Sequence, residues 1–187
     1  MATASPAVSD DARRKRIAAL SQVTRVAALV IAAALPIAGL AYWGLAPAET
    51  LAGAAMLPTA WLAEFGLGQR LLTTALALLP VLPLSWGLLR LATALAAFRQ
   101  GRPFGLAAAT GMRDFAIGVF ACTLLKLVSG ALMSVVMSWN APAGQKQLAI
   151  SVSSDMLLML LVGAVLTLVG WALAEAAAIA EENAQFI

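Results

Sequence analysis

The stretch FAIGVFACTLLKLVSGALMSVVM, residues 115–137, decides the class of this protein. A helix needs about 20 mostly apolar residues to cross the hydrocarbon core of a bilayer, and this run meets that length. The sequence therefore predicts a transmembrane helix here. Lys126 lies at its centre, where inserting a charge costs at least ~2.5 kcal/mol. We therefore expect this lysine to face a partner or a water-filled pocket.

Three further apolar runs occupy about residues 23–43, 71–93 and 155–178. The chain has 187 residues, of which 62% are hydrophobic and only 11% charged, a composition far from that of soluble domains. Together these runs predict an all-α fold, an integral membrane four-helix bundle formed by a single domain over residues 23–187. We expect residues 1–22, rich in Ala, Ser and Asp before a basic cluster, to form a disordered N-terminal tail.

Prolines and glycines mark the irregular points of this pattern. Pro36 in the first run, and Pro80 and Pro83 in the second, predict helix kinks. The second helix is expected to run to Phe98 or Arg99, because a helix-stop sequence follows. That sequence is the predicted cytoplasmic turn Gly101, Arg102, Pro103 and Phe104. Beyond this turn, residues 106–114 predict a short helix that leads into the third span.

The basic residues predict the orientation, because Lys and Arg near span ends remain on the cytoplasmic side. Arg70 and Lys146 fall on one side of the predicted spans, and nine basic residues fall on the other: Arg13, Arg14, Lys15, Arg16, Arg25, Arg90, Arg99, Arg102 and Arg113. Both termini are therefore expected to be cytoplasmic. An alternative is a cleaved signal peptide ending near Ala46-Pro47-Ala48, which would leave three spans.

Two segments, about residues 44–70 and 138–154, are then expected outside the membrane. Tyr42, Trp43, Trp61 and Trp139 fall near the outer interface, which favours amphipathic rings. The first segment is too apolar for a solvated loop, so we expect it to lie on the membrane or to pack over the mouth of the bundle. Residues 147–153 alternate in polarity and could form a strand, an extended cap or an ordinary connector.

Glu175 is the only acidic residue within a predicted span apart from Asp155 at the very start of the fourth, and it is the expected partner of Lys126. Their predicted depths differ by about 8 Å at 1.5 Å per residue, and side chains lean toward the N-terminus of their own helix. On opposed helices the two side chains would lean toward each other. We therefore predict a Lys126–Glu175 intramembrane charge pair, direct or water-bridged. A proton or anion site is the functional alternative.

A small-residue stripe on the fourth run permits close helix packing, either within the bundle or between copies of the chain. Its members recur at intervals of four, three and four: Gly163, Thr167, Gly170 and Ala174. Cys122 is the single cysteine and is interpreted as a small apolar packing residue, so no intrachain disulfide is expected.

Several classes of function have no support in the sequence. The chain contains no histidine, which removes the commonest ligand of haem and zinc sites. It shows no Gly-rich phosphate loop, no Ser-His-Asp set and no paired carboxylates within a span. We therefore expect no enzyme, no catalytic residues, no cofactor and no bound metal. The charged residues are concentrated in the short segments between the apolar runs, so nucleic acid is not an expected partner.

Short motifs in the second half of the chain carry a family resemblance. They are Gly101-Arg102-Pro103-Phe104, Met112-Arg113 and the closing sequence AEAAAIAEEN, residues 174–183. With these, the chain resembles an uncharacterised family, a domain of unknown function, of small bacterial membrane proteins. The family has four spans, a central Gly-x-Pro-Phe turn and a Glu-Glu-Asn tail. The resemblance implies a bacterial inner membrane location and suggests a regulatory role.

The leading hypothesis is a non-enzymatic protein of the bacterial inner membrane that acts as an accessory or regulatory subunit. Its cytoplasmic face, with Arg99, Arg102, Arg113 and the tail residues 181–183, would contact a cytoplasmic or membrane protein partner. A second hypothesis is a small transporter or channel, formed by a homo-oligomer, with Lys126 lining the path. A third is a structural subunit of a larger membrane complex. The lipid bilayer is a partner under all three.

Overall fold

The computed structural model describes residues 6–47, 49–51, 65–99, 105–142, 144–146 and 148–184, and no strand occurs within these ranges. Its helices are α1 (Pro6–Leu45), α3 (Leu67–Leu78), α4 (Val81–Arg99), α5 (Leu106–Met137) and α6 (Ser154–Ala184). Four stretches are long and apolar enough to cross a bilayer: Lys15–Leu45, Leu67–Phe98, Leu106–Met137 and Ser154–Ala180. The predicted all-α, four-span fold is confirmed.

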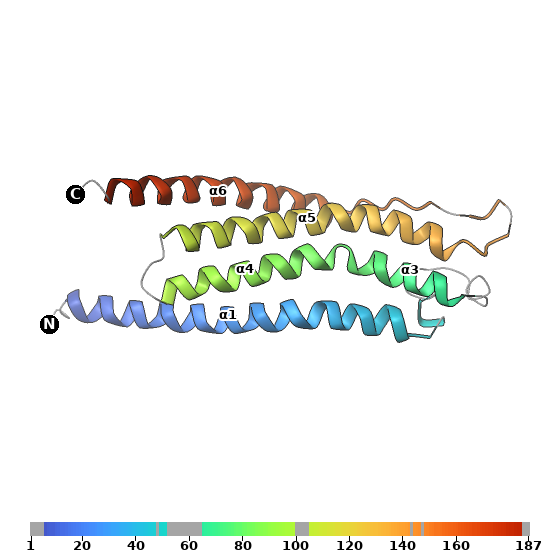
Figure 1. Cartoon of the computed structure of the whole chain (residues 1–187), viewed down its shortest axis with the longest axis horizontal. Coiled ribbons are helices and arrows are strands. Elements are labelled where there is room, and N and C mark those ends of the chain that lie inside the picture. The colour runs from blue at the N-terminus through green and yellow to red at the C-terminus, as the bar shows by residue number, and fades with distance from the viewer. Residues whose placement is uncertain are drawn as a thin grey trace.

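The four spans lie side by side as a layer rather than around a common axis (Figure 1). α1 packs mainly on α4, α4 packs on α5, and α5 packs on α6, while α3 contacts α1 and α5. The beginning of α1 and the end of α6 lie at the same end of the layer, which we call the termini end. The opposite end, where α1 leads toward α3 and α5 toward α6, is called the loop end. The second span, α3 with α4, and the third span, α5, therefore each have two neighbouring spans, whereas α6 has one principal neighbour.

The buried core of this layer consists of small residues, and its large apolar side chains point outward. The buried set between α1, α4 and α5 contains Ala28, Ala32, Ala92, Ala94, Ala108 and Ala116. Leucine, valine, isoleucine and tryptophan side chains are exposed along every long helix. This distribution reverses that of a soluble protein and is typical of membrane helices, whose interfaces are enriched in small residues.

The N-terminal segment corrects one prediction. Residues 6–22, which were expected to belong to a disordered tail, form the first turns of α1. Proline is favoured at the first position of a helix, because its fixed φ fits and its missing N–H would have no helical partner there. Pro6 occupies that position. The helix then continues without interruption into the first span and past Pro36.

The second span is broken near its middle, as its prolines predict. α3 ends at Leu78, Leu79 and Pro80 form a turn, and α4 begins at Val81 (Figure 1). Neither Pro80 nor Pro83 has an N–H to donate, so the carbonyls four residues earlier lose their usual helical donors. The break therefore places weakly satisfied backbone groups inside the membrane layer. α4 ends at Arg99, as predicted.

The loop end is closed by apolar packing and by side-chain hydrogen bonds. Leu51 is fully buried beside Met137, with Trp43 and Phe65 packed against them. The first outside segment therefore packs over the ends of the helices at Leu51, as one of its two alternatives predicted. Trp61 and the other apolar residues of 52–64 lie outside the described residues. Residues 148–153 form no strand, and the Ala149 N–H donates to Ser134 Oγ at 2.9 Å.

Candidate functional site

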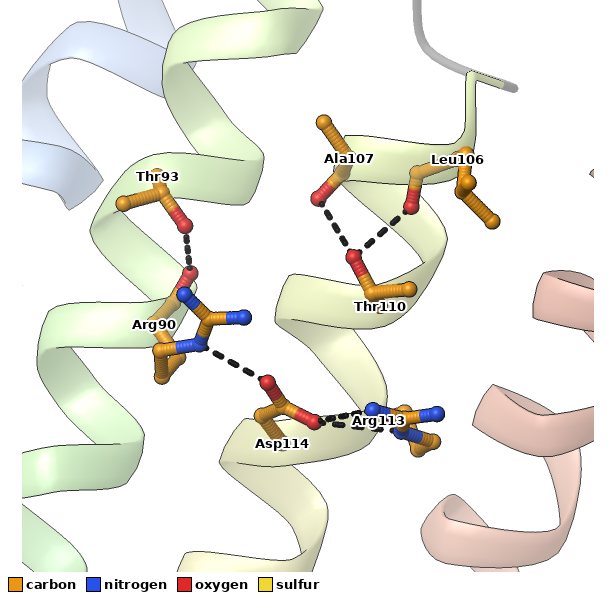
Figure 2. Close-up of polar contacts among 7 residues, drawn as sticks. All are labelled: Arg90, Thr93, Leu106, Ala107, Thr110, Arg113 and Asp114. Carbon is orange, nitrogen blue, oxygen red and sulfur yellow. Dashed lines mark hydrogen bonds and ion pairs between the residues drawn. The ribbon is translucent and has the colours of Figure 1, made fainter.

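A carboxylate buried between two arginines is the main charged site of the described chain. Asp114 on α5 has a side chain only 7% exposed and accepts hydrogen bonds on both of its oxygens. Arg90 Nε, from α4, donates to Oδ2 at 2.7 Å. Arg113 donates to Oδ1 through Nη2 at 2.8 Å and through Nε at 3.1 Å. Figure 2 shows Asp114 lying between the two guanidinium groups. We call these three residues the arginine–aspartate cluster.

Close packing of α4 and α5 holds this cluster in place. A Cβ added to Gly118 would lie 2.6 Å from the Pro83 carbonyl oxygen, and one added to Gly111 would lie 2.7 Å from the Arg90 carbonyl oxygen. The two backbones can approach this closely only because these positions are glycine. Asp114 falls between Gly111 and Gly118 at helical spacing, so it lies on the same face of α5. Its ion pair with Arg90 therefore crosses a helix interface held close by glycines.

The charges of the cluster do not cancel. Two arginines surround one aspartate, which leaves one net positive charge. The side chains of Arg90 and Arg113 are 43% and 34% exposed. The terminal nitrogens of Arg90 point away from Asp114 in Figure 2. Neither they nor Arg113 Nη1 make a hydrogen bond to any residue that the structure describes. The cluster thus joins α4 to α5 and still offers donors to an additional anion.

The helix register corrects the predicted Lys126–Glu175 pair. Gly163 of α6 packs on Phe120 of α5, and Gly170 packs on Arg113. Extending this antiparallel register places Lys126 level with residue 157, which is 18 residues before Glu175. At 1.5 Å per residue the two side chains start about 27 Å apart along the helices. The depth estimate failed because α6 is displaced toward the termini end relative to α5.

Lys126 lies instead beside the break in the second span. The contact of Gly118 with Gly87, continued along the helices, places Lys126 level with Leu79. The lysine is exposed, and within the described ranges no ion pair or hydrogen bond to its ammonium group occurs. Cys122, one turn away, lies within electrostatic range of Lys126. Lys126 is thus an intramembrane cation at the same level along the helices as the break.

The small-residue stripe of α6 packs within the chain. Cβ atoms added to Gly163 and Gly170 would lie 3.2 Å and 2.7 Å from the Cα atoms of Phe120 and Arg113. The Thr167 hydroxyl donates to the Gly163 carbonyl at 2.7 Å and so leaves no polar group unpaired on this face. The glycines of the stripe therefore serve contact with α5, and Ala174 continues it toward the termini end. Residues 101–104 of the predicted cytoplasmic turn lie outside the described residues.

Asp114 is the residue of the candidate site that the sequence did not predict. The third apolar run was taken to begin at Phe115, so its neighbour Asp114 was left outside the span. The helix predicted over residues 106–114 and the third span form one continuous helix, α5, which carries the carboxylate two turns inside its start at Leu106. A signal was present: Gly111, Asp114 and Gly118 share one helical face, and an acid on a glycine-lined face has to meet a cation across it.

Comparisons with known proteins add no relatives to this description. No protein-family model matches the chain. No curated protein and no solved structure matches it either. The assignment as a four-span membrane protein thus rests on the helices themselves.

Proposed function

We propose that this chain is a non-enzymatic accessory or regulatory subunit of the bacterial inner membrane, with both termini cytoplasmic. The observation that carries the proposal is the packing of four spans into a layer. Within the residues that the structure describes, this layer encloses no path through the membrane and leaves two broad apolar faces and the outer side of α6 uncovered. Such surfaces suit a protein that packs against another membrane protein.

The outer side of α6 is the surface best suited to a partner. Leu157, Leu161, Leu168 and Ile179 recur at helical spacing on the side opposite Gly163 and Gly170, and all four are exposed. Packing between membrane helices is driven by van der Waals contact and hydrogen bonds rather than by the hydrophobic effect. Contacts between this apolar stripe and lipid can be replaced by contacts with a partner helix at a small cost in free energy.

The termini end supplies a second, charged surface. α5 begins level with Ala177 of α6, so the last turns of α6 extend beyond it by about 10 Å at 1.5 Å per residue. Glu182 and Asn183 are exposed on this extension. The basic cluster near the start of α1 lies at the same end. A partner on this side would meet both acidic and basic groups, as the leading hypothesis expects.

The test is purification of tagged protein from native membranes in a mild detergent, with mass spectrometry of what accompanies it. The proposal predicts one or more other membrane or cytoplasmic proteins in a fixed ratio to this chain. A large assembly of many subunits would favour the role of structural subunit. Repeated recovery of this chain alone, as a monomer, would refute the proposal.

A second candidate function is an oligomeric transporter or channel with Lys126 lining its path. The observation that favours it is the level of Lys126 beside the break at Leu79 and Pro80. Broken helices near the middle of the membrane form binding sites in many transporters, because their freed carbonyls face a cavity. This candidate predicts a homo-oligomer in detergent and an anion flux in vesicles that Lys126→Met abolishes. A monomer without flux would exclude it.

A further inference from the structure

We propose that Arg90 and Arg113 bind the phosphate group of an anionic membrane lipid, with Asp114 fixing the orientation of both guanidinium groups. The site lies between α4 and α5, with α6 at its edge. The ligand class is defined by its chemistry, a phosphate monoester or diester that accepts hydrogen bonds from guanidinium. A lipid headgroup is the source that the position of the site favours, and free phosphate is the other.

The donors of the cluster provide the first argument. Asp114 uses Nε of Arg90, and Nε and Nη2 of Arg113. Nη1 and Nη2 of Arg90, and Nη1 of Arg113, retain N–H groups without a partner in the described structure. A guanidinium fork matches phosphate oxygens in geometry and charge. The two guanidinium groups are thus held in a fixed orientation with one net positive charge. Their remaining N–H groups have no hydrogen-bond acceptor among the described residues.

Depth in the membrane provides the second argument. α5 has 32 residues, or about 48 Å, whereas the hydrocarbon core is about 30 Å thick. If the helix is centred in the membrane, about six residues at each end lie in the headgroup region. Arg113 and Asp114 are the eighth and ninth residues of α5, so they sit at the boundary of the hydrocarbon core. Lipid phosphates lie just beyond that boundary.

Neighbouring residues agree with this depth. Trp171 follows Gly170, which packs on Arg113, and its ring is exposed. Tryptophan concentrates at the membrane interface.

Arg25 adds another cation on α1, and its buried Nε has no hydrogen-bond partner in the described structure. It follows Thr24, which lines a groove with Leu95 of α4, so it lies near the level of the cluster. Basic sites between helices on the cytoplasmic side are known to bind anionic lipid headgroups.

The experiment measures thermal unfolding of the full chain in neutral detergent micelles by far-ultraviolet circular dichroism. Phosphatidylglycerol, phosphatidylcholine or sodium phosphate is titrated in at matched ionic strength. We expect phosphatidylglycerol to raise the unfolding temperature in a saturable way, and phosphatidylcholine to have no comparable effect. Equal stabilisation by sodium phosphate would keep the phosphate site and identify a soluble ligand in place of the lipid.

Two variants separate binding from a purely structural ion pair. Arg113→Gln removes a donor while Asp114 keeps Arg90, and we expect the apparent affinity for phosphatidylglycerol to fall about five- to tenfold. Asp114→Asn removes the negative charge that competes with the lipid phosphate, while its amide oxygen can still accept a hydrogen bond from a guanidinium and help to orient it, so we expect that affinity to be kept or raised even though the baseline stability drops. A merely structural cluster predicts lower stability in both variants with the lipid response unchanged.

Lys146→Gln is the matched control, because it removes one positive charge at the loop end. It should leave the lipid response intact. The proposal is overturned if neither phosphatidylglycerol nor phosphate stabilises the protein. It is equally overturned if Arg113→Gln and Lys146→Gln reduce the response by the same amount, since that would show attraction by net charge alone.

Discussion

Asp114 illustrates how a single buried charge can organise a membrane interface. A carboxylate at this depth is expensive unless it is paired and hydrogen-bonded, and here both oxygens are satisfied. Removing one partner of a buried ion pair lowers the free energy of unfolding by more than the intact pair contributes to it, because an uncompensated charge remains. The cluster therefore specifies how α4 and α5 align more than it adds net stability.

Arg90→Met should lower the unfolding free energy by about 2 kcal/mol, the typical value for hydrogen bonds to a charged group. Arg113 still compensates Asp114, which keeps the loss moderate. The double variant Arg90→Met with Asp114→Asn should lose less than the sum of the single losses, because an amide carries no charge. Reversible unfolding in detergent mixtures measures all three. Additive losses would contradict a direct interaction between Arg90 and Asp114.

Lys126→Met should leave the unfolding free energy unchanged or raise it. The lysine has no ion-pair partner in the described structure, and replacing it removes a charge that costs at least ~2.5 kcal/mol to place at the centre of a span. The same unfolding assay measures the effect, with Lys146→Met as the control outside the span. A loss of stability comparable to that of Arg90→Met would mean that Lys126 has a structural partner.

At the scale of elements, the apolar centre of each span could be predicted and its ends could not. The four predicted runs lie within α1, α3 with α4, α5 and α6. The helices extend beyond them because polar residues such as Ser9, Arg113 and Glu182 continue a helix past the apolar run without an apolar signal. The break at Pro80 could be predicted, because proline removes a hydrogen-bond donor wherever it occurs.

The candidate site could be predicted only in part. The glycine stripe of α6 was visible as a local pattern with helical spacing. That Glu175 lies too far from Lys126 to pair with it was not visible, because pairing depends on the register of α5 against α6, which hydropathy does not encode. Close contacts at Gly163 and Gly170 set that register. The Arg90–Asp114 pair likewise depends on how Gly87, Gly111 and Gly118 bring α4 and α5 together.

Gly118→Ala should destabilise the protein by about 2–4 kcal/mol, in the range of overpacked cores and above. Its Cβ would lie 2.6 Å from the Pro83 carbonyl oxygen and 2.9 Å from the Gly87 Cα, and neither backbone atom can move alone. Gly130→Ala is the matched control on the same helix, with no heavy atom within 4 Å of the added Cβ. It should be neutral or stabilising, as alanine favours helix. Equal effects of the two variants would contradict the observed α4–α5 interface.

At the scale of the whole molecule, both termini lie at one end of a four-span layer, and the proposed orientation places that end in the cytoplasm. Cys122 lies inside a span, so labelling by a membrane-impermeant maleimide should be weak in the native chain. Lys146→Cys should be labelled in intact cells, and Glu182→Cys only after the membrane is permeabilised. Labelling of Glu182→Cys in intact cells, and of Lys146→Cys only after permeabilisation, would contradict the proposed orientation.

The large apolar faces of the molecule support its proposed accessory role. The layer formed by the four described spans does not by itself enclose a path across the membrane, but its faces can pack against another membrane protein. The most direct measurement is photo-crosslinking in native membranes, with a photoreactive residue at Leu168 or Leu161 on the outer side of α6. We expect a crosslinked species of defined mass containing a different protein, and no such species from Trp139 at the loop end. Crosslinks to lipid alone, or only to a second copy of this chain, would contradict the accessory role.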